Sequence, residues 1–227
     1  INGVYFRGQE VIHPNELTEN SEIYAEPLEP DFHGRNRRYL ERSRDIKMCH
    51  QTGVTIRIFA IENQHYIDYS MPFRNMQYDM LEYQHQLEEI KNRNEAEGVF
   101  ATTNEYLSKM KKTDRLHPVY TLCLYLGTEP WDGPRSLMDM MDFGDNADNL
   151  KAYFADYPLR LYCVNEERNF SMFHTEIRNV FELLPLRKDK KRLLQKLEQN
   201  STYKHMSKDS LELLSVLMDS PSIWKNR

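Results

Sequence analysis

The pattern of apolar and polar positions predicts several strands. Two strand-like runs, 42–50 and 54–63, flank the turn-forming residues 51–53, which is typical of a β-hairpin. A continuous apolar run at 117–127 predicts a central strand that is buried on both faces. A shorter run at 159–165 predicts another strand.

The same pattern predicts a long amphipathic helix over 71–93. Its apolar positions recur at steps of three and four: Phe73, Met76, Met80, Tyr83, Leu87 and Ile90. Ser70 suits the N-cap of this helix and Pro72 suits its first turn. Later helices are expected at 171–184, 186–199 and 207–219.

The order of these elements predicts an α/β fold with a mixed central sheet flanked by helices, plus a helical C-terminal tail. We expect residues 1–170 to form the sheet-bearing domain and residues 171–227 to form a helical region. Residues 1–41 are expected to be a loop or short-helix arm, because they are irregular and partly rich in proline.

Composition excludes some classes of protein. The formal net charge of −5 gives no overall basic signature of a nucleic-acid binder, although Lys and Arg cluster locally. The three cysteines are far apart, which argues against a structural zinc site and favours reduced thiols in a cytoplasmic protein. No apolar run is long enough to span a membrane.

A carboxylate and an amide follow the second strand of the predicted hairpin. If the turn has two residues, Gln51 pairs with Val54, and Asp45 and Glu62 then share one face as diagonal neighbours, roughly 7 Å apart. Gln64 points to the same face if the strand continues. A three-residue turn would shift the pairing and separate the acids.

Two converging acids beside a neutral amide suit a hard divalent cation. Mg²⁺ prefers oxygen ligands, and it can hold a phosphate and activate water. Gln64 cannot act as a general base, but it can orient water or phosphate through hydrogen bonds. The alternative is a hairpin end with solvated acids, which the spacing alone favours.

Three stretches resemble one known family: "RSRDIKM", "IFAIENQHYIDYSMPFRNMQYDMLEYQHQL" and "HPVYTLCLYLGTEPWDGPRSLMDMM". Over about residues 40–165 the chain is similar to the recombination-promoting nuclease / putative transposase family, within the PD-(D/E)XK nuclease superfamily. The resemblance implies a restriction-endonuclease-like core of helix, three strands, helix and strand. It also implies a Mg²⁺-dependent DNA endonuclease, with Mn²⁺ as an alternative metal.

The resemblance also implies roles for individual residues. Asp45 and Glu62 match the metal-binding acids, and Gln64 takes the position of the superfamily's lysine. Asp45 follows Arg44, where the superfamily motif has proline. The first core helix is expected to precede Ile1 or to survive only as a remnant.

The start of the helix after this motif supplies further candidates for substrate binding: Arg74, Gln77 and Tyr78. Arg74 and Tyr78 lie one turn apart and off the predicted apolar stripe, so both can face the metal site. Arg74 would hold a phosphate, and Tyr78 would form a hydrogen bond nearby. The alternative for Arg74 is an arginine that satisfies a surface acid.

Two kinds of function therefore stay open. The first is a DNA endonuclease, with DNA as its partner, no membrane association and an open question of homodimerisation. The second is a degenerate member that only binds nucleic acid or protein, with the helices after residue 171 as its surface. The basic run at 187–192 favours a solvated helix face over a DNA clamp. Trp131 is expected to anchor its loop.

Overall fold

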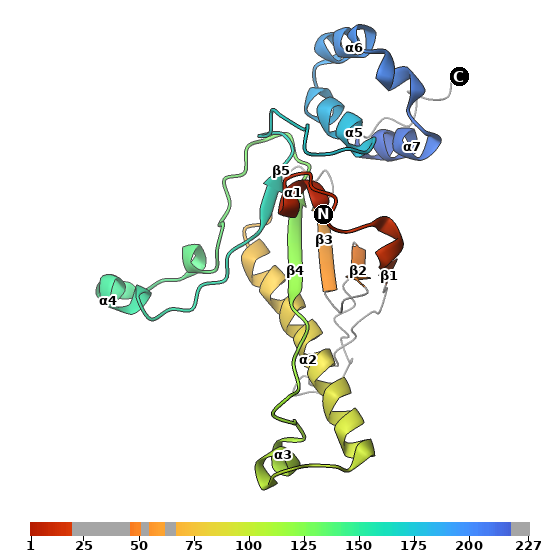
Figure 1. Cartoon of the computed structure of the whole chain (residues 1–227). Helices are drawn as coiled ribbons and strands as arrows, with labels where there is room; N and C mark the ends of the chain where they lie inside the picture. Colours follow the sequence, from red (N-terminus) through yellow and green to blue (C-terminus); the bar gives the residue numbers. More distant parts are fainter. Residues whose placement is uncertain (20–45, 51–54, 62–66, 219–227) are drawn as a thin grey trace, which may run out of the picture.

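The computed structural model describes residues 1–19, 46–50, 55–61 and 67–218, and shows a mixed α/β fold (Figure 1). Five strands form one sheet in the order β1-β2-β3-β4-β5. Their bounds are β1 Leu17–Glu19, β2 Ile46–His50, β3 Thr55–Ile61, β4 Val119–Tyr125 and β5 Leu161–Cys163. The first three strands pair antiparallel, whereas β3, β4 and β5 pair parallel. The mixed sheet agrees with the sequence prediction, but β1 lies where only an irregular arm was expected.

The helices are α1 Asn2–Phe6, α2 Met71–Glu97, α3 Thr103–Ser108, α4 Ala147–Lys151, α5 Ile177–Leu183, α6 Lys190–Gln199 and α7 Lys208–Leu217. Helices α1 and α2 contact opposite faces of β4. Tyr5 of α1 packs edge-to-face on Tyr120 at 5.9 Å between ring centroids, whereas Asp79 of α2 accepts a hydrogen bond from the neighbouring Thr121. The described residues include no helix that is both long and apolar enough to cross a membrane.

The β2–β3 hairpin exists, but its register differs from the expected one. Cys49 pairs with Thr55 and Ile46 pairs with Ile58. A two-residue turn at residues 52 and 53 would instead have placed Cys49 opposite Ile56. Five residues, 50–54, separate the paired residues Cys49 and Thr55, whereas a two-residue turn requires an even number. The expected register is therefore wrong by one position.

Helix α2 is longer than predicted and buries a different face. It ends at Glu97 and is capped by Gly98, whose φ of 66° is the left-handed conformation common after helices. Its buried residues are Met71, Pro72, Asn75, Tyr78, Asp79, Glu82, Gln86, Ile90 and Asn94. Phe73 and Met80 of the predicted stripe are 41% and 53% exposed. The predicted apolar face is therefore wrong at Phe73 and Met80, although Ile90 is buried as expected, because a largely polar face of α2 meets the sheet.

Hydrogen bonds explain how this polar face is accommodated. The Asp79 carboxylate accepts from the Thr121 hydroxyl at 2.5 Å and from the Tyr157 hydroxyl. The side-chain oxygen of Gln86 accepts from the backbone N–H of His117 at 2.7 Å. Buried polar groups with such partners avoid most of the penalty of leaving water.

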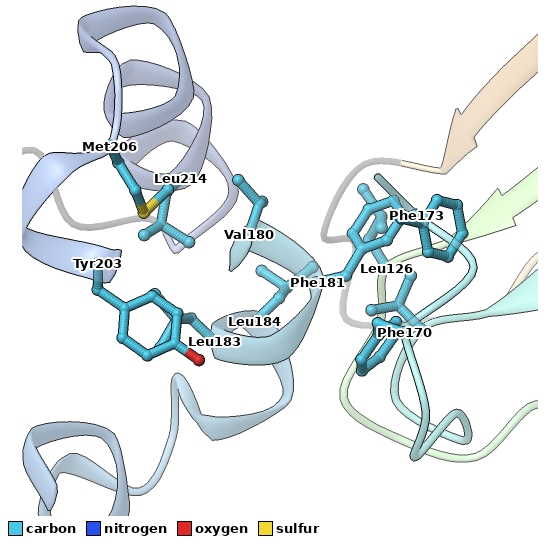
Figure 2. Packing of buried hydrophobic residues seen from close by; sticks show 11 residues of the cluster. Leu126, Phe170, Phe173, Val180, Phe181, Leu183, Leu184, Tyr203, Met206 and Leu214 are labelled. Atoms are coloured by element: carbon cyan, nitrogen blue, oxygen red, sulfur yellow. The ribbon is translucent and has the colours of Figure 1, made fainter. Parts of the chain in front are cut away.

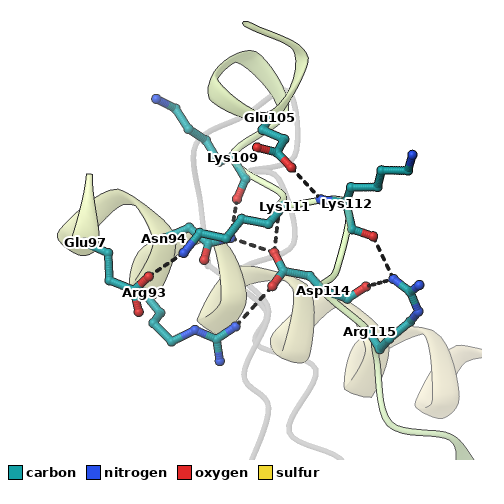
Figure 3. Close-up of polar contacts among 9 residues, drawn as sticks. All are labelled: Arg93, Asn94, Glu97, Glu105, Lys109, Lys111, Lys112, Asp114 and Arg115. Atoms are coloured by element: carbon teal, nitrogen blue, oxygen red, sulfur yellow. Dashed lines mark hydrogen bonds and ion pairs between the residues drawn. The ribbon is translucent and has the colours of Figure 1, made fainter. Parts of the chain in front are cut away.

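Helix α3 and the C-terminal half of α2 project beyond the sheet (Figure 1). We call residues 91–116 the α2–α3 arm. Figure 3 shows the polar network that holds the arm together. The Asn94 side-chain amide donates to the carbonyl oxygen of Lys109 at 3.0 Å and to Asp114 at 2.7 Å. Arg93 adds an ion pair with Asp114 at 3.5 Å. A buried asparagine therefore fixes the return path of the chain.

A second core lies at the carboxyl ends of β4 and β5, where the C-terminal helices gather. Figure 2 shows Phe181 of α5 pointing toward Phe170 and Phe173, while Leu183 and Leu184 lie on the side of Tyr203. Phe173 and Phe181 pack edge-to-face at 5.1 Å between centroids. Helix α5 thus joins the end of the sheet to the helical region that follows it.

Candidate functional site

The predicted metal ligands and the amide beside them, Asp45, Glu62 and Gln64, lie outside the described residues. The described strands do place the chain next to them. Ile46 begins β2 and Ile61 ends β3, and these two strands are antiparallel. In the sequence, Asp45 immediately precedes β2 and Glu62 immediately follows β3. Because the strands are antiparallel, the start of β2 and the end of β3 lie at the same end of the hairpin.

The observed β2–β3 register no longer supports a metal site shared by Asp45 and Glu62. The expectation that Asp45 and Glu62 point to one face depended on pairing Gln51 with Val54. The observed pair of Cys49 and Thr55 is shifted by one residue from that arrangement. The hairpin geometry alone no longer predicts that the two carboxylates converge.

Arg74 is described, and an acid six residues earlier holds it. Its guanidinium forms an ion pair with Asp68, which also accepts from the Ser70 backbone N–H at 2.8 Å and hydroxyl at 2.6 Å. Ser70 is the N-cap residue of α2, as predicted, but its side chain makes no capping hydrogen bond to the helix and bonds to Asp68 instead. The structure agrees with the alternative reading of Arg74 as an arginine that satisfies a nearby acid.

The electrostatics of this pair keep both groups charged. Burial alone would raise the pKa of Asp68, but hydrogen bonds from Ser70 and Arg74 outweigh it, and the pKa lies below its usual value. Burial would likewise lower the pKa of Arg74. Hydrogen bonds with Tyr78 and Asp68 outweigh it and raise the pKa.

Tyr78 lies on the buried face of α2. It is only 3% exposed and packs in a cluster with Met71, Cys123 and Trp131. The structure does bring Tyr78 to Arg74, as their spacing of one turn predicted. The expectation that Tyr78 lies off the buried face is wrong, whereas Gln77 is half-buried.

Sequence reasoning missed the buried carboxylate of Asp79. It is 7% exposed and is held by hydroxyls from β4 and from the segment before β5. Nearby, burial raises the pKa of Tyr5 to about 12, and its hydroxyl finds no hydrogen-bond partner among the described residues. The sequence did contain a signal, because Asp79, Glu82 and Gln86 recur at steps of three and four.

The loop at 128–136 lies beside the start of α2. The Trp131 indole N–H donates to the Gly133 carbonyl oxygen at 2.9 Å, and its backbone N–H donates to Glu166 at 2.9 Å. Its ring packs edge-to-face on Tyr125 at 5.2 Å between centroids. Trp131 is thus a loop anchor, as predicted, and is not exposed for base stacking.

Within the described ranges, no three His, Cys, Asp or Glu side chains gather in a way that would hold a metal ion. Asp45 and Glu62 fall outside those ranges, so they remain the candidates for an oxygen-rich metal site. Comparisons with family models, with curated proteins and with solved structures find no match for this chain.

Proposed function

We propose that the protein is a Mg²⁺-dependent DNA endonuclease of the PD-(D/E)XK type. The order of elements along the chain carries this proposal. Among the described residues, α1, β1, β2, β3, α2 and β4 come in the order helix, three strands, helix and strand, apart from a 3-10 turn at Pro14–Glu16 and the short α3 before β4. This is the core order that the sequence resemblance implies, with the short α1 in the place of the first core helix.

The position of the motif supports the same proposal. Glu62 and Gln64 lie in the short segment between Ile61, the last residue of β3, and Met71, the first residue of α2. In a parallel arrangement such as β3-β4-β5, ligands usually bind beyond the carboxyl ends of the strands. The described chain therefore leads into the motif from the carboxyl end of β3, which is the edge where ligands usually bind.

The proposed roles follow from the chemistry of each side chain. Asp45 and Glu62 would supply carboxylate oxygens to Mg²⁺ or Mn²⁺, and a bound divalent ion would lower the pKa of the attacking water. Gln64 would orient that water or the phosphate by hydrogen bonding. The ion pair with Asp68 leaves Arg74 less suited to hold phosphate than the sequence suggested.

The shifted hairpin register favours a second candidate, a degenerate nuclease fold that binds nucleic acid without cutting it. In that case Asp45 and Glu62 need not converge, because no metal has to be shared. The two candidates predict the same fold and the same binding, and they differ only in metal-dependent cleavage.

The deciding experiment is nicking of supercoiled plasmid with Mg²⁺, Mn²⁺ or EDTA. Wild type, Glu62→Gln and the exposed control Glu88→Gln on α2 are compared. We expect metal-dependent nicking by wild type and by the control, and none by Glu62→Gln. Nicking that survives EDTA or the Glu62 substitution would contradict the nuclease site. DNA binding without any nicking would establish the second candidate.

A further inference from the structure

A broad cleft lies between α5, α6 and the segment after β5, with a volume of about 880 Å³. Its charged lining consists of Arg168, Arg178, Arg192, Lys196, Glu167 and Glu182. Four cations thus face two carboxylates, in a chain whose overall charge is −5. The excess of positive charge is local to this cleft.

One of the two carboxylates is already shared among several donors. Glu182 accepts from Arg178 at 2.8 Å and from the Tyr203 hydroxyl at 2.6 Å, and it pairs with Lys196 at 3.4 Å. Burial opposes its charge, but these partners outweigh it, so the pKa of Glu182 lies below its usual value. Glu182 therefore stays ionised and serves to position the two cations.

The other carboxylate is occupied by the backbone. A side-chain oxygen of Glu167 accepts from the N–H groups of Arg168 and Asn169 at 2.8 and 3.0 Å. The guanidinium groups of Arg168 and Arg192 make no ion pair within the described part of the chain, and both residues are exposed. Two arginines are thus uncommitted at the wall of one cleft.

In the basic run at 187–192, Lys190, Lys191 and Arg192 of α6 are exposed, which agrees with the solvated helix face that the sequence favoured, but Arg187 differs. Arg187 points inward and donates to the carbonyl oxygens of Leu126 and Leu184, at 2.5 and 3.2 Å. Arg192 lines the cleft, whereas Lys190 and Lys191 are exposed outside it. Residues of one basic run therefore do different things: Arg187 holds the backbone, Arg192 lines the cleft, and the two lysines face solvent.

From this arrangement we propose that the cleft binds the phosphate groups of a nucleic-acid strand. Arginine forks match phosphate oxygens, and the side-chain amides of Gln195 and Gln199 on the same wall can donate further hydrogen bonds. The open shape and the two uncommitted arginines suit contacts with two phosphates along one strand. The geometry of the cleft indicates phosphate binding, and the identification of the ligand as DNA rests on the proposed endonuclease function.

The position of the cleft relative to the strands supports this assignment. Asn165, which lines the cleft, follows β5 at the carboxyl edge of the sheet. Ile61, which immediately precedes Glu62, pairs with Tyr125 at the same edge. A strand held in the cleft thus lies on the side of the molecule where the proposed cutting residues follow β3.

The test measures binding of a fluorescently labelled single-stranded DNA by anisotropy, in EDTA so that cleavage is absent, over a range of salt concentrations. The variant Arg168→Gln/Arg192→Gln is compared with wild type and with Lys190→Gln/Lys191→Gln, a matched double control on α6, the helix that carries Arg192. We expect the arginine variant to bind at least tenfold more weakly. A plot of the logarithm of the binding constant against the logarithm of the salt concentration should become less steep by about 1.4, because each lost phosphate contact on single-stranded DNA removes about 0.7 from the slope.

Equal binding by wild type and the arginine variant, or equal weakening by the lysine control, would overturn the proposal. Full displacement of the DNA by millimolar inorganic phosphate would also overturn it, in favour of a site for a small anion. Circular dichroism checks that both variants fold. If binding weakens as expected but wild type never nicks plasmid with metal, the cleft assignment stands and the nuclease proposal fails.

Discussion

Gln64 is an amide at a position where the resembled superfamily has lysine, and this makes it the most informative single residue. An amide does not titrate over the working pH range, so Gln64 adds no group to a pH–rate profile. Its proposed role is therefore limited to orienting water or phosphate.

We expect Gln64→Ala to reduce cleavage about 10²-fold, the usual scale for one positioned contact to the transition state. Gln64→Lys should keep substantial activity, because it places a cation near the phosphate. Single-turnover cleavage at saturating Mg²⁺ measures both, with circular dichroism as the folding control. An inactive lysine variant beside an active alanine variant would show that the site rejects a cation.

A second residue-scale prediction tests which face of α2 is buried. Tyr78→Ala should lower the free energy of unfolding by about 3–5 kcal/mol, because it empties a packed site. Met80→Gln should change it by less than about 0.5 kcal/mol, because Met80 is 53% exposed. Urea unfolding measures both, and a larger loss for Met80→Gln would support the apolar stripe that the sequence predicted.

At the scale of elements, the sequence predicted the existence and order of most helices and strands. The β-rich run at 117–127 contains β4, and the periodic segment at 71–93 lies within α2. These elements were predictable because apolar spacing reflects local geometry. The β2–β3 register was not, because one residue more or less in a turn reverses which side chains share a face.

The candidate site was less predictable for the same reason. Convergence of Asp45 and Glu62 depends on register, which is a property of two strands and of the turn that joins them. The buried face of α2 likewise depends on Thr121 and Tyr157, which lie far along the chain and supply the partners of Asp79. The spacing of residues along a helix shows which side chains share a face, but it does not show which face packs against the rest of the protein and forms hydrogen bonds with it.

The α2–α3 arm gives an element-scale prediction about pH. Hydrogen bonds from Asn94 and from the Lys111 backbone N–H hold the pKa of Asp114 below its usual value. A carboxyl group with a lowered pKa stabilises the folded arm above its unfolded pKa of about 3.9, and this contribution is lost as the pH falls through the lower folded value.

The backbone amide of Lys111, which donates to Asp114 at 2.7 Å, should report this step. We expect its proton chemical shift to titrate with a midpoint below 3.9, the usual value for aspartate. Two-dimensional NMR between pH 2 and 6 measures the midpoint, with Asp114→Asn as the variant that abolishes it. A midpoint at or above the usual value would contradict the arrangement in Figure 3.

At the scale of the whole molecule, α5 connects the sheet to the C-terminal helices. Phe181 is 4% exposed and packs toward Phe170 and Phe173, whereas Leu184 is 1% exposed and belongs to the same core cluster. Phe181→Ala should cost about 3–5 kcal/mol and Leu184→Ala about 2–5 kcal/mol.

Because one cluster contains both residues, each substitution should shift one common unfolding transition. Calorimetry and denaturant unfolding followed by two probes test this expectation. Separate transitions, each sensitive to only one substitution, would show that the helical region unfolds independently of the sheet.

The order of strands in the sheet also has a consequence for how the chain acquires its structure. Among the five described strands, each pairing apart from the β2–β3 hairpin joins segments far apart in sequence, as Thr55 with Val119 illustrates. Closing such long loops is entropically unfavourable before the contacts form, so folding should be slow for a chain of this size. During synthesis, β3 leaves the ribosome well before β4 and exposes an unpaired edge, which makes the nascent chain a natural client for chaperones.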